Sequence, residues 1–251
     1  MNQLYLIGRA PGYSLSPQLH SAACSAFNLP WEYKLLAVPE FAEAIDTLRS
    51  PGCIGANVTI PYKEECIRYL DELDPVAEQL GAVNTIVRRD KRLIGYNTDV
   101  VGLNRDLVRL GITTTGRKIL ILGAGGAAAA VLANLNSSAT VTIVCRRQEQ
   151  ANDLAKRFKQ AVEHIPWHTP ELSEADLIFV CTPPGVWQRW SWPQKALIYN
   201  LNYLENDILH ANYYSGLGML VFQAAESFTL WSNRPAPVAA MAAAVNLPLT
   251  P

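Results

Sequence analysis

The sequence predicts an α/β protein built from two α/β domains, and two observations support this prediction. Strand-like and helix-like segments alternate through about the first 100 residues, which is the pattern of packed α/β layers. A second series begins at Lys118–Leu122, where an apolar strand passes directly into a glycine cluster and an alanine-rich helix. A chain of 251 residues is long enough to give two small domains a core each.

In the first domain, short strands are expected to alternate with helices. The strands are Leu4–Gly8, Tyr33–Ala37, Cys53–Val58, Thr85–Arg88 and Arg92–Tyr96, and the helices are Gln18–Phe27, Pro39–Leu48 and Pro61–Leu70. Proline is tolerated at the first position of a helix, so Pro61 is expected to open the third one. The polar residues between the last two strands predict a hairpin.

A helix from Val100 to Leu110, stopped by Gly111, is expected to connect the domains. After it come an expected helix at Ala127–Leu135, a strand at Thr140–Val144, a helix at Gln148–Phe158, and strands at Asp176–Cys181 and Ala196–Asn200. The last 35 or so residues predict two helices that return to the first domain. The expected domains are therefore 1–102 plus 216–251, and 103–215.

Composition excludes several classes of protein. Charged residues make up 17% of the chain and the net charge is −1, which argues against a nucleic-acid partner or an anionic membrane surface. No apolar stretch reaches the length of a membrane span, and the first residues lack the features of a signal peptide. The five cysteines form no C-x-x-C pair, and His20 and His164 are not at metal-ligand spacing. We expect a cytoplasmic protein with a small-molecule partner and no metal.

The glycine cluster Gly123-Ala124-Gly125-Gly126-Ala127 predicts a site for a pyrophosphate group. Glycines let a ligand approach the backbone, and the helix that follows directs unpaired N–H groups at an anion. The spacing departs from the strict G-x-G-x-x-G fingerprint, so a tight strand-to-helix connection without a ligand is the alternative.

The next strand ends at Cys145-Arg146-Arg147. In dinucleotide-binding folds this position lies beside the adenosine ribose, where an acidic residue binds the 2′-hydroxyl of NAD and arginine accommodates the 2′-phosphate of NADP. Two arginines and no acid favour NADP in a Rossmann-like domain. The alternative is that Arg146 and Arg147 only begin a solvated helix.

Candidate catalytic residues lie in the first domain. Asn57 and Thr59 share one face of a strand, and Lys63 is expected in the first turn of the following helix. The positive end of that helix dipole would lower the lysine pKa and assist proton exchange. The alternative is an exposed lysine balanced by Glu64 and Glu65.

Other polar residues have two possible roles: each can bind a ligand, or it can stabilise the local backbone. Asp99 begins a helix and is either functional or a simple N-cap. Ser14 and Ser16 can converge on a carboxylate or serve turn geometry. Asn84 and Gln223 are expected to be buried, where their amides need a polyol or nearby backbone as partners.

Together these stretches resemble the shikimate dehydrogenase family. They occur in the family's order and span nearly the whole chain, so chance agreement is very improbable. The matching blocks are Ser14–Pro17 with His20, Gly55–Lys63, Gly81–Thr85, Gly95–Asp99 with Gly102, Gly123–Ala127 and Gly216–Ala224.

The resemblance implies reversible, NADPH-dependent reduction of 3-dehydroshikimate to shikimate in aromatic amino-acid biosynthesis, with Lys63 and Asp99 as the catalytic pair. The expected substrate-binding residues are Ser14, Ser16 and Tyr203 for the carboxylate, and Asn57, Thr59, Asn84 and Gln223 for the ring hydroxyls. The expected cofactor-binding residues are Gly123, Gly125, Gly126, Ala127, Arg146, Arg147, Thr182 and Gly216. We expect a monomer or a homodimer.

The sequence departs from the family pattern outside the Lys–Asp pair, at Tyr13, Cys145, Arg147, Asn200 and 204–207. These departures question cofactor preference and rate more than reaction class. Two alternatives stay open: a quinate or aminoshikimate dehydrogenase that shares the same pair, and a ligand-binding homologue that has lost catalysis.

Overall fold

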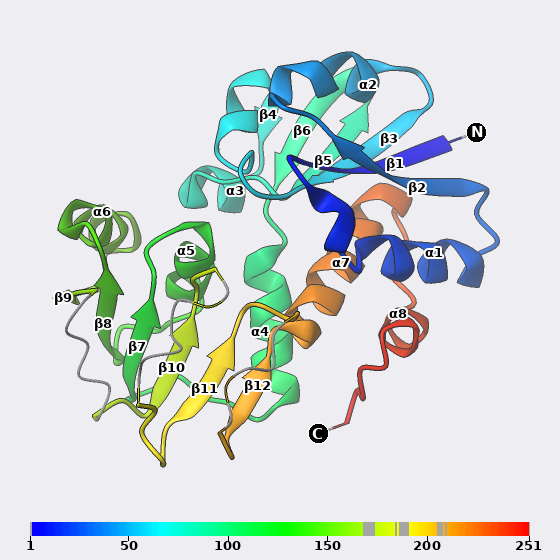
Figure 1. The fold of residues 1–251 in the computed structure, drawn as a ribbon. Coiled ribbons are helices and arrows are strands. Elements are labelled where there is room, and N and C mark those ends of the chain that lie inside the picture. The colour runs from blue at the N-terminus through cyan, green and yellow to red at the C-terminus, as the bar shows by residue number, and fades with distance from the viewer. Residues whose placement is uncertain are drawn as a thin grey trace. The chain divides into compact units, whose positions relative to one another are not determined.

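The computed structural model describes residues 2–167, 174–183, 185, 191–204, 208 and 210–250. The chain divides into two compact units, one formed by Met1–Gly102 with Leu220–Pro251 and the other by Leu103–Met219. Each unit contains a six-stranded sheet with helices packed on it (Figure 1). The predicted fold class, two α/β domains, is confirmed.

The sheet of the first unit is mixed, with the order β2-β1-β3-β5-β6-β4. Its strands are β1 (Asn2–Gly8), β2 (Trp31–Ala37), β3 (Cys53–Val58), β4 (Glu72–Leu73), β5 (Thr85–Arg89) and β6 (Arg92–Tyr96). β1 pairs with β2 and β3 in parallel, whereas β3, β5 and β6 are antiparallel. Asp90 and Lys91 both have positive φ, as a two-residue hairpin between β5 and β6 requires.

The helices of the first unit cover this sheet and its flank. The α-helices are α1 (Ser16–Ala26), α2 (Ile45–Arg49), α3 (Pro75–Leu80) and α8 (Val238–Ala244), with 3₁₀ helices at Pro11–Tyr13, Phe41–Ala44 and Glu65–Tyr69. α4 (Asp99–Arg109) and α7 (Leu217–Ser232) each have residues in both units. Among the described helices, none is long and apolar enough to cross a membrane.

The C-terminal helices return to the first unit, as predicted. Val221, Ala224 and Phe228 of α7 and Met241 of α8 form one apolar cluster with Leu19 of α1. A second cluster packs the 3₁₀ helix Phe41–Ala44 and α2 against the sheet, and Phe41, Leu48 and Tyr62 are among its most buried members. Burial of these large side chains supplies the main driving force for closing the unit.

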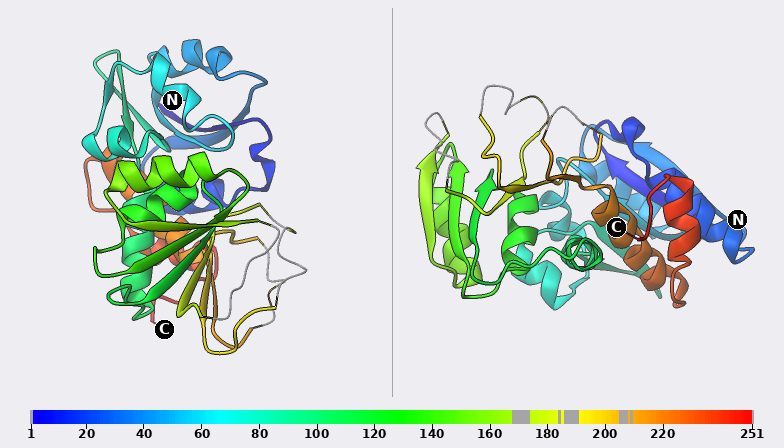
Figure 2. Two further views of the ribbon diagram at one scale, coloured as in Figure 1. Left: turned by 90° about the vertical axis from the view of Figure 1, so that its left-hand side faces the viewer. Right: turned by 90° about the horizontal axis from the view of Figure 1, so that it is seen from below.

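The sheet of the second unit is wholly parallel, with the order β12-β11-β10-β7-β8-β9. Its strands are β7 (Lys118–Leu122), β8 (Thr140–Cys145), β9 (Val162–Pro166), β10 (Leu177–Val180), β11 (Leu197–Asn200) and β12 (Tyr213–Ser215), with helices α5 (Gly126–Ala133) and α6 (Gln148–Phe158). The strands fan out with the usual twist of a parallel sheet (Figure 2). This is the doubly wound order of dinucleotide-binding folds.

Residues 216–219, which the sequence-based division places in the first domain, group with the second unit. The packing of Gly218 gives a reason, because a Cβ there would lie 1.9 Å from Oδ1 of Asp106, a buried residue of the same unit. The assignment of a substrate role to one unit and a cofactor role to the other stays a prediction.

The helix predicted from Pro61 to Leu70 is wrong. Residues 61–64 form a turn, in which the Tyr62 N–H donates to the Thr59 carbonyl, and only Glu65–Tyr69 is helical, as a 3₁₀ helix. The Tyr62 side chain is 1% exposed and its hydroxyl donates to the Val38 and Pro39 carbonyls. Burial of this ring decides the local path of the chain, overriding the helix-start signal of Pro61.

Smaller elements differ as well. The helix predicted at Pro39–Leu48 is divided into the 3₁₀ helix Phe41–Ala44 and α2. β4, β9, β12 and α3 were not predicted: β4 and β12 are too short to show a period, and β9 is an edge strand that tolerates Pro166. α3 does carry a signal, because Asp74 caps its start through the Val76 N–H and Gly81 ends it with positive φ.

Candidate active site

Lys63 and Asp99 form an ion pair in the first unit. Lys63 Nζ lies 2.6 Å from Asp99 Oδ2, and the two side chains are 29% and 10% exposed. Asp99 is the first residue of α4, and its backbone N–H is bound by the Asn97 side chain. Lys63 lies in the turn before the 3₁₀ helix, so the helix dipole expected to act on it is not there. The pair is half-sheltered and still open to solvent on the lysine side.

Asn84 fixes the other oxygen of the Asp99 carboxylate. Its Nδ2 donates to Asp99 Oδ1 over 2.8 Å, while its Oδ1 accepts the Thr98 backbone N–H at 2.8 Å. A backbone N–H can only donate, so this second bond sets which end of the Asn84 amide faces Asp99. Asp99 thereby accepts one charge-assisted bond on each oxygen, from Lys63 and from Asn84.

Gln223 and Asn57 extend this cluster. Gln223 lies on α7, and its Oε1 accepts from Asn84 Nδ2 at 3.3 Å and from Thr98 Oγ1 at 3.4 Å. Asn57 lies on β3. Its Nδ2 donates to the Asn84 carbonyl, and its Oδ1 accepts from the Tyr33 hydroxyl at 2.8 Å. The four sequence-predicted residues of this cluster other than Lys63 are each at least 90% buried: Asn57, Asn84, Asp99 and Gln223.

Ser14, Ser16 and Thr59 lie at other edges of the same unit. The Ser14 hydroxyl donates to Ser16 Oγ at 3.0 Å and accepts the Ser16 N–H, so the two hydroxyls are held together at the start of α1. Thr59 directly follows β3, and its N–H donates to the Ile7 carbonyl of β1. Its methyl group occupies the space beside Gly8, where an added Cβ would lie only 2.6 Å from it.

Three residues of the cluster were missed by sequence reasoning: Thr85, Thr98 and Ser227. The Ser227 hydroxyl lies within hydrogen-bond distance of both threonine hydroxyls and of Asn57 Nδ2. The sequence carries a signal for two of them. Thr98 precedes Asp99 directly, and Ser227 follows Gln223 by one helical turn, on the same face of α7.

In the second unit, the glycine cluster opens a pocket of about 530 Å³. Gly123 has a φ of +106°, and a Cβ there would lie 3.1 Å from the Cys181 carbonyl oxygen. At Gly125 and Gly126 a Cβ would meet nothing within 4 Å, so their backbone faces open space at the start of α5. That arrangement leaves room for a ligand where the first N–H groups of the helix are unpaired.

The same pocket is lined by Arg146 and Arg147, which are exposed, and by Thr182. Thr182 Oγ1 is buried and has no hydrogen-bond partner in the described part of the chain. The Cys145 thiol bonds to the Arg147 carbonyl, and burial raises its pKa. Two cations at one end, an open glycine turn, and an unpaired buried hydroxyl fit a phosphorylated dinucleotide.

Gly216 and Tyr203 also belong to the second unit. A Cβ on Gly216 would lie 2.5 Å from the Leu201 carbonyl oxygen, so only glycine permits this close approach of two backbones. Tyr203 lies in the bend after β11 and is partly buried. Residues 205–207, part of the segment that departs from the family pattern, lie outside the described residues.

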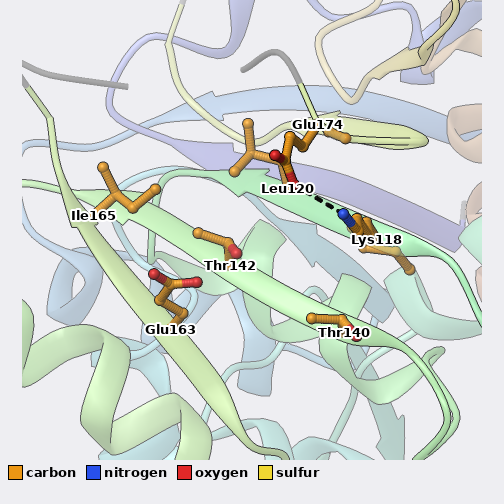
Figure 3. Close-up of a pocket in the computed structure, with 9 residues that line it drawn as sticks. Lys118, Leu120, Thr140, Thr142, Glu163, Ile165 and Glu174 are labelled. Carbon is orange, nitrogen blue, oxygen red and sulfur yellow. Dashed lines mark hydrogen bonds and ion pairs between the residues drawn. The ribbon is translucent and has the colours of Figure 1, made fainter. Parts of the chain in front are cut away.

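A second pocket, of about 340 Å³, lies on one face of β7, β8 and β9. Figure 3 shows its polar lining, with Lys118 paired to Glu174 at 2.8 Å and Glu163 standing apart from them. None of the sequence-predicted site residues lines it. Across the described residues, no group of three or more His, Cys, Asp or Glu side chains is placed to hold a metal ion.

Comparison with known proteins gives matches along most of the chain. Three family profiles match: the shikimate dehydrogenase substrate binding domain at residues 6–86, shikimate / quinate 5-dehydrogenase at 107–184, and the shikimate 5′-dehydrogenase C-terminal domain at 216–245. A shikimate dehydrogenase (NADP(+)) of Moorella thermoacetica is 39% identical, over 94% of this chain and 90% of the relative.

Solved structures give the same result. A shikimate dehydrogenase in complex with NADP+ has a TM-score of 0.86 at 32% identity, covering 98% of this chain and 95% of the other. The enzyme of Thermus thermophilus in complex with shikimate has a TM-score of 0.85 at 29% identity, covering 98% of both chains. The resemblance read from the sequence motifs is confirmed.

Proposed function

The chain belongs to the shikimate dehydrogenase family, and we propose on this basis that it interconverts 3-dehydroshikimate and shikimate as an NADP-dependent oxidoreductase acting on a CH–OH group. The observation that carries the proposal is the Lys63–Asp99 ion pair, bordered by the buried amides of Asn84 and Gln223. A cation, a carboxylate and neutral amides side by side suit a substrate that carries several hydroxyl groups.

Lys63 and Asp99 act as the catalytic pair. The Lys63 ammonium has N–H groups beyond the one that Asp99 accepts, so it can donate to the reacting oxygen and pass a proton to it in the direction of reduction. In the opposite direction the pair takes the proton of the hydroxyl. Asn84 holds Asp99 Oδ1, which keeps the carboxylate aimed at Lys63 during both steps.

The other predicted residues of the first unit bind and orient the substrate. The paired hydroxyls of Ser14 and Ser16 are neutral donors suited to the substrate carboxylate. Asn57, Thr59, Asn84 and Gln223 hold the ring hydroxyls, and Tyr203 assists at the carboxylate. Because the amides are buried and held by fixed partners, little side-chain entropy is lost when substrate binds.

NADPH supplies the hydride when bound. Gly123, Gly125, Gly126 and Ala127 would hold its pyrophosphate at the start of α5, which the open space at two of the glycines supports. Arg146 and Arg147 would bind the 2′-phosphate, and Thr182, whose hydroxyl has no partner among the described residues, would line the same pocket. The Gly216 backbone would bind the nicotinamide amide.

The test pairs shikimate or quinate with NADP+ or NAD+ and follows reduced cofactor at 340 nm at alkaline pH. We expect turnover with shikimate and NADP+ to exceed that of the other three combinations. A strong preference for quinate would identify a quinate dehydrogenase. If no combination gives turnover while calorimetry shows shikimate binding, the chain is a non-catalytic ligand-binding homologue and the proposal is wrong.

Cellular location, pathway, partners and oligomeric state complete the proposal. We place the protein in the cytoplasm, in the biosynthesis of aromatic amino acids. We expect it to act without a metal or a nucleic-acid partner, as a monomer or a homodimer. Size-exclusion chromatography with light scattering distinguishes the two oligomeric states.

A further inference from the structure

The hydroxyl of Ser227 lies at the centre of the buried polar cluster in the first unit. The residue is 0% exposed. Its Oγ accepts from Asn57 Nδ2 at 3.1 Å and lies 2.8 Å from Thr85 Oγ1 and 3.2 Å from Thr98 Oγ1. It also lies 3.0 Å from the Gln223 carbonyl, one turn earlier in α7. Ser227 thus connects α7 with β3, with β5 and with the residue that precedes α4.

The side chains of the cluster have few alternative hydrogen-bond partners, because the groups around Ser227 are already bonded to one another. The Thr85 hydroxyl donates to Asn84 Oδ1 at 2.9 Å, and that oxygen also takes the Thr98 backbone N–H. Thr85 Oγ1 accepts from Asn57 Nδ2 at 3.1 Å. The amides of Asn57 and Asn84 are therefore locked through shared hydroxyls. Ser227 ties Asn57 to α7, and Gln223 ties Asn84 to the same helix.

We propose that Ser227 is a positioning residue for substrate recognition, with Thr85 as its link to Asn84. This inference rests on the proposed function, in which Asn57, Asn84 and Gln223 bind the ring hydroxyls of shikimate. Ser227 Oγ accepts from Asn57 Nδ2, which fixes the orientation in which the Asn57 amide, with its Oδ1 on the Tyr33 hydroxyl, meets the substrate. Without Ser227, the Asn57 amide and Thr85 lose a buried partner and adopt other arrangements.

The test compares Ser227→Ala with Thr229→Ala. Thr229 lies on the same helix, and its hydroxyl, like that of Ser227, lies 3.0 Å from the carbonyl oxygen four residues back, but it takes no part in the cluster. We expect Ser227→Ala to raise KM for shikimate about tenfold, equal to about 1.4 kcal/mol, and to leave KM for NADP+ unchanged. The dissociation constant of shikimate, measured by calorimetry without cofactor, should rise by the same factor. The control variant Thr229→Ala should lower Tm and leave both KM values and the dissociation constant of shikimate unchanged.

A second pair of variants covers the case in which Ser227→Ala does not fold. Thr85→Val removes a hydroxyl with little change of shape, whereas Thr85→Ser keeps it. We expect weaker shikimate binding in the first and recovery in the second. Unchanged shikimate binding in Ser227→Ala or Thr85→Val would overturn the inference and leave the proposed function intact. An unmodified protein that neither binds nor oxidises shikimate would overturn both.

Discussion

Replacing Lys63 with alanine removes the cation whose Nζ lies 2.6 Å from Oδ2 of the Asp99 carboxylate. General acid–base catalysis by a positioned side chain typically contributes about 10²–10⁴-fold to a rate. In the proposed mechanism Lys63 is the proton donor, and in the structure it also pairs with Asp99, so we expect the middle or upper part of that range. A loss of about 10³-fold in kcat corresponds to about 4 kcal/mol in the activation free energy.

Initial rates of NADPH formation at 340 nm, at varied shikimate and saturating NADP+, give kcat and KM separately. We expect KM for shikimate to change by less than about threefold, because the serines and amides proposed to bind the substrate remain. Lys118→Ala is a matched control, since Lys118 pairs with Glu174 at 2.8 Å on an exposed surface of the second unit. If Lys63→Ala keeps more than about a tenth of the normal kcat, Lys63 is not the proton donor.

Three other predictions concern separate parts of the molecule. Asp99→Asn should lower kcat by about 10²-fold with KM for shikimate nearly unchanged, because it removes the negative partner of Lys63; an unaltered kcat would show that the charge is unimportant. Arg146→Gln should raise KM for NADP+ about tenfold and leave KM for NAD+ unchanged, because only NADP+ carries the 2′-phosphate, and equal effects on both cofactors would refute this role. Burial lowers the pKa of His20 to about 3, below the 6.5 of an unfolded chain, so unfolding takes up a proton between these values. The free energy of unfolding should therefore fall by about 1.4 kcal/mol per pH unit as the pH drops through this window, and chemical denaturation of His20→Gln should show a shallower dependence on pH.

Periodic segments made the fold predictable. β3, β7 and β8 are apolar runs bounded by glycine or polar residues, and each was predicted within a residue of its observed bounds. The prediction failed at Pro61, where the local signal for a helix start was overridden by a contact with a distant segment of the chain. The Tyr62 ring is buried beside Phe41, from a segment about 20 residues away, and no local pattern reveals that contact.

The sequence motifs named several residues that the structure brings together, but they did not show how these residues are bonded. Motifs named Lys63, Asn84, Asp99 and Gln223, and the structure joins them through hydrogen bonds and one ion pair, although their roles remain predictions. The part played by Ser227 required the packing of α7 against the sheet, which brings residues more than a hundred positions apart into one cluster. The spacing of residues along α7 places Ser227 on the same face as Gln223, but it does not show which side chains Ser227 contacts.

A crystal structure of the protein with shikimate and NADP+ bound measures most directly whether Lys63 and Asp99 act on the substrate. We predict that the hydroxyl to be oxidised lies about 2.6–3.2 Å from Lys63 Nζ or from a carboxylate oxygen of Asp99. The substrate carboxylate should lie on Ser14 and Ser16. Shikimate bound with its reacting hydroxyl beyond hydrogen-bond distance of both Lys63 and Asp99 would contradict the proposed catalytic pair.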